Sequence, residues 1–349
     1  MRVGPNTSSP GRPARWVRTA VAGAAGLANG LYSAANGVPE GLVAGLMAHR
    51  GAEPASIRKA VAVTQLVTNT LAGAVVGGLV AGPAGLVMGA AAGYVTGTVG
   101  NYMEHRSQQL DAVVDRIRAG SGGVLRALWT GASQGAVQGF RFGRVSGAAT
   151  AAGFLDGVRE VGKAPSATVS PELAPRTLLE GAASVLFGVA GVLINAPAGA
   201  VLGSLRSVHD PARPTPTRLE RHLLLLATNV GKVLPGVVLG SLIPGPVGIL
   251  AGTAVGLLTA SITSMVDGKA GFHPGLVNTV RQAVASSHGQ EECPDSARVF
   301  YRGGRGTVVG FCAGLREGWR AGCEAGVQIV RDGLSGPDTS VGTERDTQS

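Results

Sequence analysis

The sequence predicts an all-α protein made of glycine-rich helical hairpins. Three long apolar stretches are each interrupted near the middle by Pro and Gly. Proline fixes its own φ and disfavours helix in the residue before it, so each stretch is expected to fold as helix, turn and helix. Glycine supplies 56 of the 349 residues and charged residues only 15%, against about 25% in typical globular chains. Glycine does not recur at every third position, which excludes collagen, and the many Val, Leu, Ile and Ala residues argue against disorder.

The N-terminal region is basic and precedes a glycine-rich helical segment. Arg2, Arg12, Arg15 and Arg18 occur there, and no acidic residue comes before Glu40. We expect residues 1–25 to form a disordered basic leader. An Arg-rich, acid-free start also suits an organelle transit peptide or the leader of a secreted bacterial effector. Residues 26–59 are predicted to form glycine-rich amphipathic helices.

The three apolar stretches supply the predicted hairpins. The first runs from Val61 to Gly100, the second from Leu178 to Leu205 and the third from Leu223 to Met265. Their predicted turns are centred on Pro83, on Pro197, and on Pro244 with Pro246. Most arms approach the length of about 20 residues that a bilayer requires. The second arm of the middle hairpin is shorter, and we expect it to be re-entrant or interfacial.

The positions of the charges favour a membrane. Every Lys and Arg except Lys232 lies outside the three hairpins, and the three turns carry no charge. Hairpins that enter the bilayer from one side, with all basic segments on the same face, would produce this pattern. Lys232 is then an intramembrane polar residue that snorkels, pairs with a carbonyl or lines a polar path. A soluble helical bundle or a shallow interfacial hairpin is the alternative.

An internal duplication is expected from self-similarity at a shift of 163 residues. Gly73–Gly93 and Gly236–Gly256 share ten of 21 residues, including the Gly-Pro turn. The first and third hairpins are each followed by a short amphipathic helix, at Leu110–Ile117 and Leu276–Val284, and then by a segment with glycine at every fourth position. The predicted units are therefore 60–163 and 221–333, with 164–220 as a degenerate second hairpin with linkers, and 334–349 as a disordered tail.

Glycines at a spacing of four form one stripe along a helix. Each costs about 0.5–1 kcal/mol relative to Ala, so a helix that keeps them needs a compensating close contact with another backbone. The predicted packing residues are Gly85, Gly89, Gly93, Gly131, Gly135, Gly139, Gly143, Gly147, Gly248, Gly252, Gly256, Gly306, Gly310, Gly314, Gly318, Gly322 and Gly326. In this spacing alone the chain resembles the broad class of glycine-zipper membrane proteins, which implies helix–helix association within the chain or between copies. A flexible glycine-rich surface is the alternative.

The net charge of +9 attracts phosphate groups of lipid or nucleic acid. The basic residues form no dense run interleaved with aromatics, so we expect anionic lipids and no nucleic acid. The charged glycine-rich segments are predicted to lie at the membrane surface rather than cross it. Their expected membrane-surface residues are Arg126, Trp129, Arg141, Arg316, Trp319 and Arg320.

Two motifs imitate catalytic ones. The G-x-S-x-G match around Ser133 sits inside a glycine array rather than between a strand and a helix. The phosphate-loop match ends in Ala164, where Ser or Thr would hold Mg²⁺. The three cysteines and six histidines show no metal-ligand spacing. We expect no catalytic residue, no cofactor and no metal.

These observations lead to one hypothesis and one alternative. The hypothesis is a non-enzymatic membrane-inserting protein that self-associates as a homo-oligomer through its glycine zippers. It would act as a scaffold or a pore in an organelle membrane, or in a host membrane as a secreted bacterial effector. The alternative is a soluble glycine-rich helical adaptor that binds an acidic protein partner.

Overall fold

The computed structural model describes residues 12–107, 115, 123–161, 170–208, 217–241, 248, 251, 252, 254, 256, 274–286 and 295–335. Within these residues the secondary structure is entirely helical, so the all-α prediction is confirmed. The elements are α1 (Arg12–His49), α2 (Pro54–Ser107), α4 (Val124–Val161), the 3₁₀ turn η1 (Pro171–Leu173), α5 (Leu178–Val208), α6 (Arg218–Ser241), α8 (Pro274–Ser286) and α9 (Asp295–Ser335).

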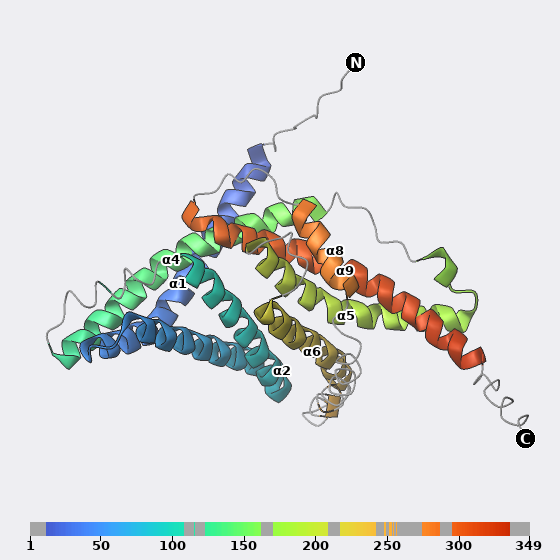
Figure 1. Ribbon diagram of the computed structural model, residues 1–349, viewed down its shortest axis with the longest axis horizontal. Coiled ribbons are helices and arrows are strands. Elements are labelled where there is room, and N and C mark those ends of the chain that lie inside the picture. The colour runs from blue at the N-terminus through green and yellow to red at the C-terminus, as the bar shows by residue number, and fades with distance from the viewer. Residues whose placement is uncertain are drawn as a thin grey trace, which may run out of the picture.

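Two antiparallel pairs of long helices form the frame of the molecule (Figure 1). In the first pair, α1 lies along α4, and the Cα of Gly37 faces the carbonyl of Gly135. In the second pair, α5 lies along α9, and Gly199 faces the carbonyl of Gly310. Both pairs repeat such contacts at every fourth residue, because that spacing keeps each contact on one face of its helix.

The two pairs meet where α4 crosses α9. Gly153 of α4 lies against the carbonyl of Tyr301, and Gly304 of α9 lies against the carbonyl of Thr150. The rings of Phe142 and Phe300 pack edge to face beside this crossing, with centroids 5.1 Å apart. The close backbone contacts at these two glycines and the packing of the two aromatic rings together hold the two halves of the frame in contact.

A tight reversal divides α2 into two arms. Gly82 has a φ of 61°, a left-handed conformation that suits glycine because it has no Cβ. The arms pack against each other through glycine, with Gly73 on the carbonyl of Gly89 and Gly77 on the carbonyl of Gly85. In Figure 1 the blue and teal arms join near the α2 label.

The predicted turn at Pro197 is wrong, because α5 continues through this residue. The segment 164–220 therefore contains no second hairpin in its described part, and the arm expected to be re-entrant is the buried second half of α5. A proline inside a helix costs about 3 kcal/mol through a lost hydrogen bond and a steric clash. The unbroken packing of α5 on α9, from Ala183 near Gly326 to Gly203 near Gly306, offsets that cost.

A Thr-x-x-Glu capping pattern starts both α5 and α6, and the apolar periodicity that predicts hairpins does not reveal it. The Glu180 amide donates to the Thr177 hydroxyl at 3.1 Å, while the carboxylate of Glu180 accepts from the Arg176 amide at 2.6 Å. At α6 the Glu220 amide donates to Thr217, and the Thr217 amide donates back to the carboxylate of Glu220. Each Thr-x-x-Glu pattern satisfies backbone N–H groups that the first helical turn leaves without partners.

Other boundaries differ from expectation or lie outside the described residues. The leader was expected to be disordered to residue 25, but α1 begins at Arg12. Pro244 and Pro246 lie outside the described residues, as do 336–349 and, apart from Asp115, the expected short helix at 110–117. The second short helix is α8. Gly256, in the predicted second arm of the third hairpin, packs close to α6, because a Cβ on it would lie 2.7 Å from the Val233 carbonyl oxygen.

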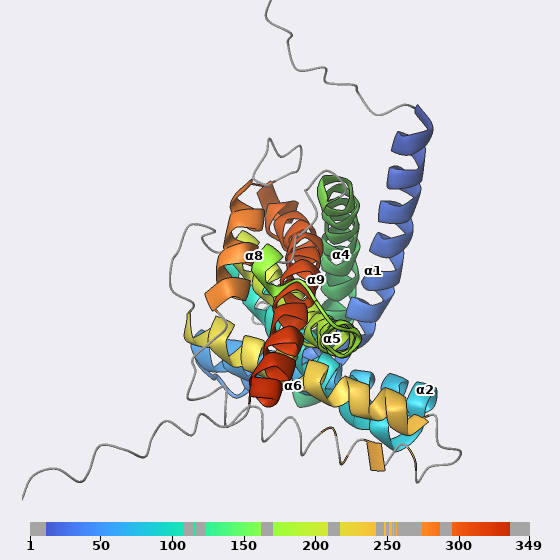
Figure 2. The ribbon, with the colours of Figure 1, turned by 90° about the vertical axis from the view of Figure 1, so that its right-hand side faces the viewer.

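The largest apolar core joins α5, α6, α8 and α9. A smaller core surrounds Phe300 at the crossing, and a third joins Ala44 of α1 to Ile57 of α2. Figure 2 shows α2 and α6 together below the two pairs of long helices.

Candidate functional site

A cavity of about 940 Å³, half open to the surface, lies between the helices of the frame. Six helices line it: α1, α2, α4, α5, α6 and α9. The lining is mostly apolar and includes Val61, Val95, Val99, Phe142, Val201, Val230, Phe300 and Phe311. Its polar side chains include Asn29, Tyr32, Ser33, Asn36, Gln65, Asn69, Thr96, Gln138, Ser146, Thr150, Ser204 and Thr307.

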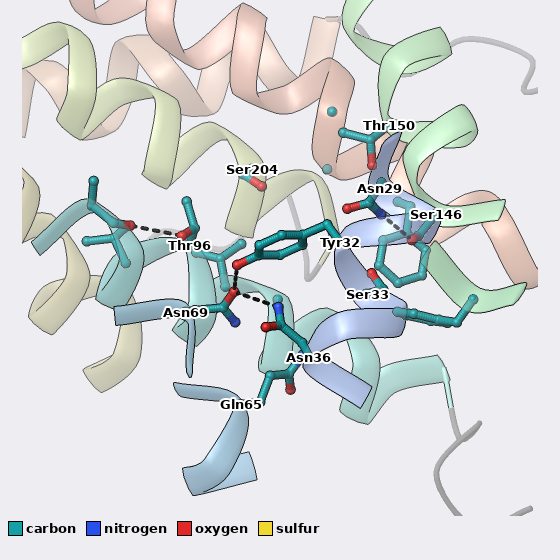
Figure 3. A pocket seen from close by; sticks show the side chains of 18 of the residues that line it. Asn29, Tyr32, Ser33, Asn36, Gln65, Asn69, Thr96, Ser146, Thr150 and Ser204 are labelled. Atoms are coloured by element: carbon teal, nitrogen blue, oxygen red, sulfur yellow. Dashed lines mark hydrogen bonds between the residues drawn. The ribbon is translucent and has the colours of Figure 1, made fainter. Parts of the chain in front are cut away.

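The polar side chains concentrate where α1 faces α2 (Figure 3). The Tyr32 hydroxyl donates to Asn69 Oδ1, and Asn36 Nδ2 donates to the same oxygen at 3.5 Å. Asn29 lies further along α1, where its Nδ2 donates to the Gly143 carbonyl at 2.9 Å and to Ser146 Oγ at 3.1 Å. One band of amides and hydroxyls therefore extends from α2 across α1 to α4.

Helical spacing explains why these residues share a wall. Asn29, Ser33, Asn36 and Glu40 follow one another on one face of α1 at intervals of three or four residues. Gln65 and Asn69 do the same on α2. The apolar and glycine periodicity of the sequence does not indicate this site. The available signal was a polar stripe of uncharged side chains on an otherwise apolar helix.

The cavity carries almost no charge. Among its lining residues, all within the described ranges, Glu40 is the one charged side chain, and no Lys, Arg or His contributes. The whole chain, in contrast, has a net charge of +9. The positive charge of the chain therefore does not come from the described lining of the cavity.

The predicted packing glycines mostly meet partners within the same chain. Gly89 and Gly93 of α2 face Gly73 and Asn69 on the opposite arm, and Gly85 faces Gly77. The α4 glycines Gly131, Gly135, Gly139, Gly143 and Gly147 face α1, and the α9 glycines Gly306, Gly310, Gly314, Gly318, Gly322 and Gly326 face α5. In the predicted second arm of the third hairpin, Gly248 is buried and Gly252 is half-buried.

The predicted membrane-surface residues divide into two groups. Arg126, Trp129 and Arg141 lie on the exposed side of α4, with Trp129 76% exposed. On α9 the side chains are engaged within the fold. Arg316 donates to the Val161 carbonyl at 3.1 Å, and Arg320 pairs with Glu317 at 2.7 Å and with Glu324 at 2.8 Å. Trp319 packs near Gly188 of α5.

Charged groups also link the helices outside the cavity. Asp156 of α4 accepts from Arg18 at 2.7 Å and from the Tyr301 hydroxyl at 2.8 Å. Burial and the neighbouring Asp156 carboxylate raise the pKa of Tyr301 well above its usual range. Arg305 of α9 pairs with Glu160. These contacts tie α1, α4 and α9 together at the crossing and face no cavity wall, which suits a structural role.

Lys232 and Ser133 lie on continuous helices. Lys232 is half-buried in α6. Ser133 lies inside α4, and its hydroxyl donates to the Thr130 carbonyl at 3.2 Å. A nucleophile elbow needs a strand before the serine, whereas helix α4 extends on both sides of it.

Two described helical segments are long and apolar enough to cross a membrane, Pro54–Leu79 of α2 and Leu178–Val208 of α5. Comparison with protein families, curated proteins and solved structures finds no match to the chain. Its function is therefore argued from its own residues.

Proposed function

We propose that the chain is a non-enzymatic, membrane-inserted protein that acts as a scaffold in the bilayer. The observation that carries this proposal is an uncovered apolar stripe on the first arm of α2. Val63, Val67, Leu71, Val75 and Leu79 follow one another at every fourth residue, and all are exposed, Leu79 by 83%. Only 6% of the apolar window in this arm is buried within the protein.

A second uncovered surface occupies the first half of α5. Leu178, Leu179, Val185, Leu186 and Val189 are exposed there, with Leu178 95% exposed. The one acidic residue in this part, Glu180, is paired with Arg331 of α9 and so does not interrupt the apolar surface. Both apolar surfaces belong to the two segments that are long enough to span a bilayer.

Lipid is the cover that fits these surfaces best. Burial of one Leu or Val side chain is worth about 1.5–3 kcal/mol, so leaving two such stripes in water would cost a large share of the stability of a domain. Soluble monomers rarely expose apolar patches larger than a few hundred Å². A 26-residue arm is about 39 Å long as a helix, longer than the bilayer's hydrocarbon core of about 30 Å.

The glycine stripes support a scaffold in a specific way. Because they are occupied by helices of the same chain, we assign them to the rigid pairing of α1 with α4 and of α5 with α9. Association between copies would use other surfaces, and a homo-oligomer stays a prediction. Arg126, Trp129 and Arg141, which are not needed for pairing, are the proposed contacts with anionic headgroups.

We also propose an internal duplication with revised boundaries. Each half would consist of a long helix, an apolar hairpin and a partner helix that returns along the first. This arrangement matches α1 to α5 and α4 to α9. Pro39 and Pro197 support it, since each lies inside the long helix two residues before a glycine that packs on the partner helix, Gly41 and Gly199 respectively. The segment first assigned to an extra hairpin then becomes the opening helix of the second half.

Membrane extraction tests the proposal directly. The full chain should stay with the membranes of expressing cells in alkaline carbonate and should float with vesicles of phosphatidylcholine and phosphatidylglycerol. Release by carbonate without detergent, together with a monodisperse protein in buffer, would reject insertion and favour the soluble adaptor. A scaffold should leave vesicle-trapped carboxyfluorescein in place, whereas rapid dye release would identify a pore.

A further inference from the structure

We infer that the central cavity binds a neutral, lipid-like molecule with hydroxyl groups at one end, such as a glycerol ester of a fatty acid. This inference rests on the proposed function, because a ligand of this kind reaches the cavity from the bilayer. Its basis is the combination of a large apolar wall, one polar band and an almost complete lack of charge.

The size of the cavity suits a molecule rather than a few waters. Small-molecule sites typically enclose about 300–1,000 Å³, and this cavity of about 940 Å³ is at the upper end of that range. Filled with water it would hold about 30 molecules, each seeking two to four polar partners. Most of its polar side chains lie on α1 and α2, and fewer lie on the opposite wall, Ser204 and Thr307 among them, so water there would find fewer partners.

That opposite wall suits an acyl chain. Phe142 and Phe300 contact each other there, and Phe311, Val201 and Val230 continue the apolar lining from α9, α5 and α6. Side chains from four helices thus supply the contact area that an apolar chain needs.

The polar band suits hydroxyl groups in particular. Tyr32, Asn36 and Asn69 already form one hydrogen-bonded group at this end. An asparagine amide presents two N–H donors and a carbonyl acceptor, so this group can both give and receive hydrogen bonds. A hydroxyl also does both. A phosphate or sulfate would only accept, and a quaternary ammonium would do neither.

The lack of charge in the cavity lining also restricts the head group of the ligand. A charged head group that leaves water without a counter-charge incurs a large desolvation cost. The described lining residues offer no cation for an anionic head, although the chain as a whole has a net charge of +9. The ligand of the cavity and the headgroups expected at the surface are therefore of different chemical classes.

The cavity is reachable without unfolding. Tyr32 and Phe311 line it, and they are 44% and 41% exposed. These two residues lie on α1 and α9, so the lining reaches the surface of the molecule on the two long-helix pairs.

Three ligands that share an 18-carbon monounsaturated hydrocarbon tail but differ in head group test the inference. We would measure saturable binding of radiolabelled 1-oleoylglycerol, oleyl sulfate and oleyltrimethylammonium to the full chain in nanodiscs, with empty nanodiscs as the background. The glycerol ester should bind at least tenfold more tightly than either permanently charged analogue. Equal binding of the three, or preference for a charged one, would overturn the inference, and preference for the cation would point to Glu40.

Two substitutions on α5 locate the binding. Ala200→Phe places a ring in the cavity and should weaken binding of 1-oleoylglycerol at least tenfold, while Ala182→Phe, on the exposed side of the same helix, should leave it unchanged. Asn36→Leu keeps the size of the side chain but removes its hydrogen bonds, and should weaken the glycerol ester about fivefold without affecting the charged analogues. Unchanged binding in both Ala200→Phe and Asn36→Leu would show that the ligand binds elsewhere.

The same samples separate failure of this inference from failure of the proposed function. Carbonate extraction and helical circular dichroism are recorded for each variant. If the protein stays in the membrane in carbonate but shows no saturable binding, only the inference about the cavity ligand fails. If carbonate releases the protein but it still binds 1-oleoylglycerol in a manner that depends on Ala200, only the proposed membrane scaffold fails.

Discussion

Gly41 of α1 and Gly131 of α4 contact each other reciprocally, because the carbonyl oxygen of each takes up the space that a Cβ on the other would need. The same reciprocity joins Gly199 to Gly310 in the other helix pair. Each glycine lowers the stability of its own helix, and the close contact between the two backbones offsets this loss. The frame therefore requires glycine at these positions, where any side chain would separate the helices.

Substitution of Gly41 by Ala should destabilise the protein despite the better helix propensity of Ala. A methyl group there would overlap the Gly131 carbonyl, and overpacking of this kind costs about 1–3 kcal/mol. Gly23→Ala on the same helix is the matched control, since no atom lies within 4 Å of its added Cβ, and it should stabilise by about 0.5–1 kcal/mol. Unfolding in detergent micelles titrated with SDS, followed by circular dichroism, measures both. Similar gains for the two variants would mean that α1 and α4 do not touch at Gly41.

Replacement of Gly314 and Gly318 by Leu together should prevent α5 from packing on α9. These glycines face the carbonyls of Asn195 and Gly191, where a Leu side chain has no room. We expect rapid proteolysis and loss of most helical signal, whereas Gly333→Leu on the same helix, with no neighbour within 4 Å of its Cβ position, should behave like the parent. A folded double variant that differs only in oligomer size would place this stripe between copies instead.

The sequence indicated which faces of the helices make close contacts, but it did not indicate which helix packs on each face. The spacing of Gly306 to Gly326 requires a close neighbour on one face, and this much follows from helical geometry. Identifying α5 as that neighbour requires the whole fold, because the glycines of α5 are less regular and Pro197 suggested a turn. Local rules assign Pro197 a cost of about 3 kcal/mol, and only tertiary packing along the full length of α5 could outweigh it.

The cavity was less predictable than the frame. Asn29, Ser33 and Asn36 form a helical stripe that can be read from the sequence. Whether such a stripe faces water, lipid or a cavity depends on the position of α2, which no local pattern specifies. The capping boxes at Thr177 and Thr217 were readable in full, and they would have placed the starts of α5 and α6 within a residue or two.

Removal of the charge from Glu220 should be costly. Its carboxylate lies 4.0 Å from Nε of Arg206, and the two side chains are only 6% and 1% exposed. Glu220→Gln keeps an acceptor for the Thr217 amide but leaves a buried guanidinium beside a neutral group, so we expect a loss of about 3 kcal/mol. Adding Arg206→Met should recover much of this loss, and exposed Asp332→Asn should stay within about 0.5 kcal/mol of the parent. A mild effect of Glu220→Gln with no recovery in the double variant would contradict a coupled pair.

Glu324 should make stability dependent on acid pH. Burial raises the pKa of its carboxyl, but hydrogen bonds from the Ser170 hydroxyl and amide and the charge of Arg320 outweigh burial, so this pKa lies below its ordinary value of 4.5. The folded carboxyl therefore binds its proton less readily than the unfolded one. Its contribution is complete above pH 4.5 and is lost as the pH falls towards the lowered folded pKa.

Glu324→Gln tests this dependence. At pH 7 the variant should be less stable by about 1 kcal/mol, and the difference should shrink as the pH falls below about 4. Thermal unfolding measured from pH 7 to pH 3 gives the comparison. Glu172→Gln, whose side chain is exposed on η1, should leave the acid limb unchanged. A pH-independent gap between parent and Glu324→Gln would show that the carboxylate charge does not matter there.

An aspartate at Val75 separates lipid from water as the cover of α2. Val75 is 61% exposed, so in a water-soluble fold Val75→Asp should change stability by no more than about 0.5 kcal/mol. At the centre of a membrane helix an aspartate costs about 2.5–3.5 kcal/mol, or about a hundredfold in the insertion equilibrium, and Val75, four residues before the end of the span at Leu79, should show part of this cost. Val145→Asp on α4 is the control, because Val145 is 43% exposed on a helix whose Arg126 and Arg141 we place at the headgroups. Vesicle flotation should therefore fall sharply for Val75→Asp alone, and equal flotation of the two variants would remove α2 from the bilayer.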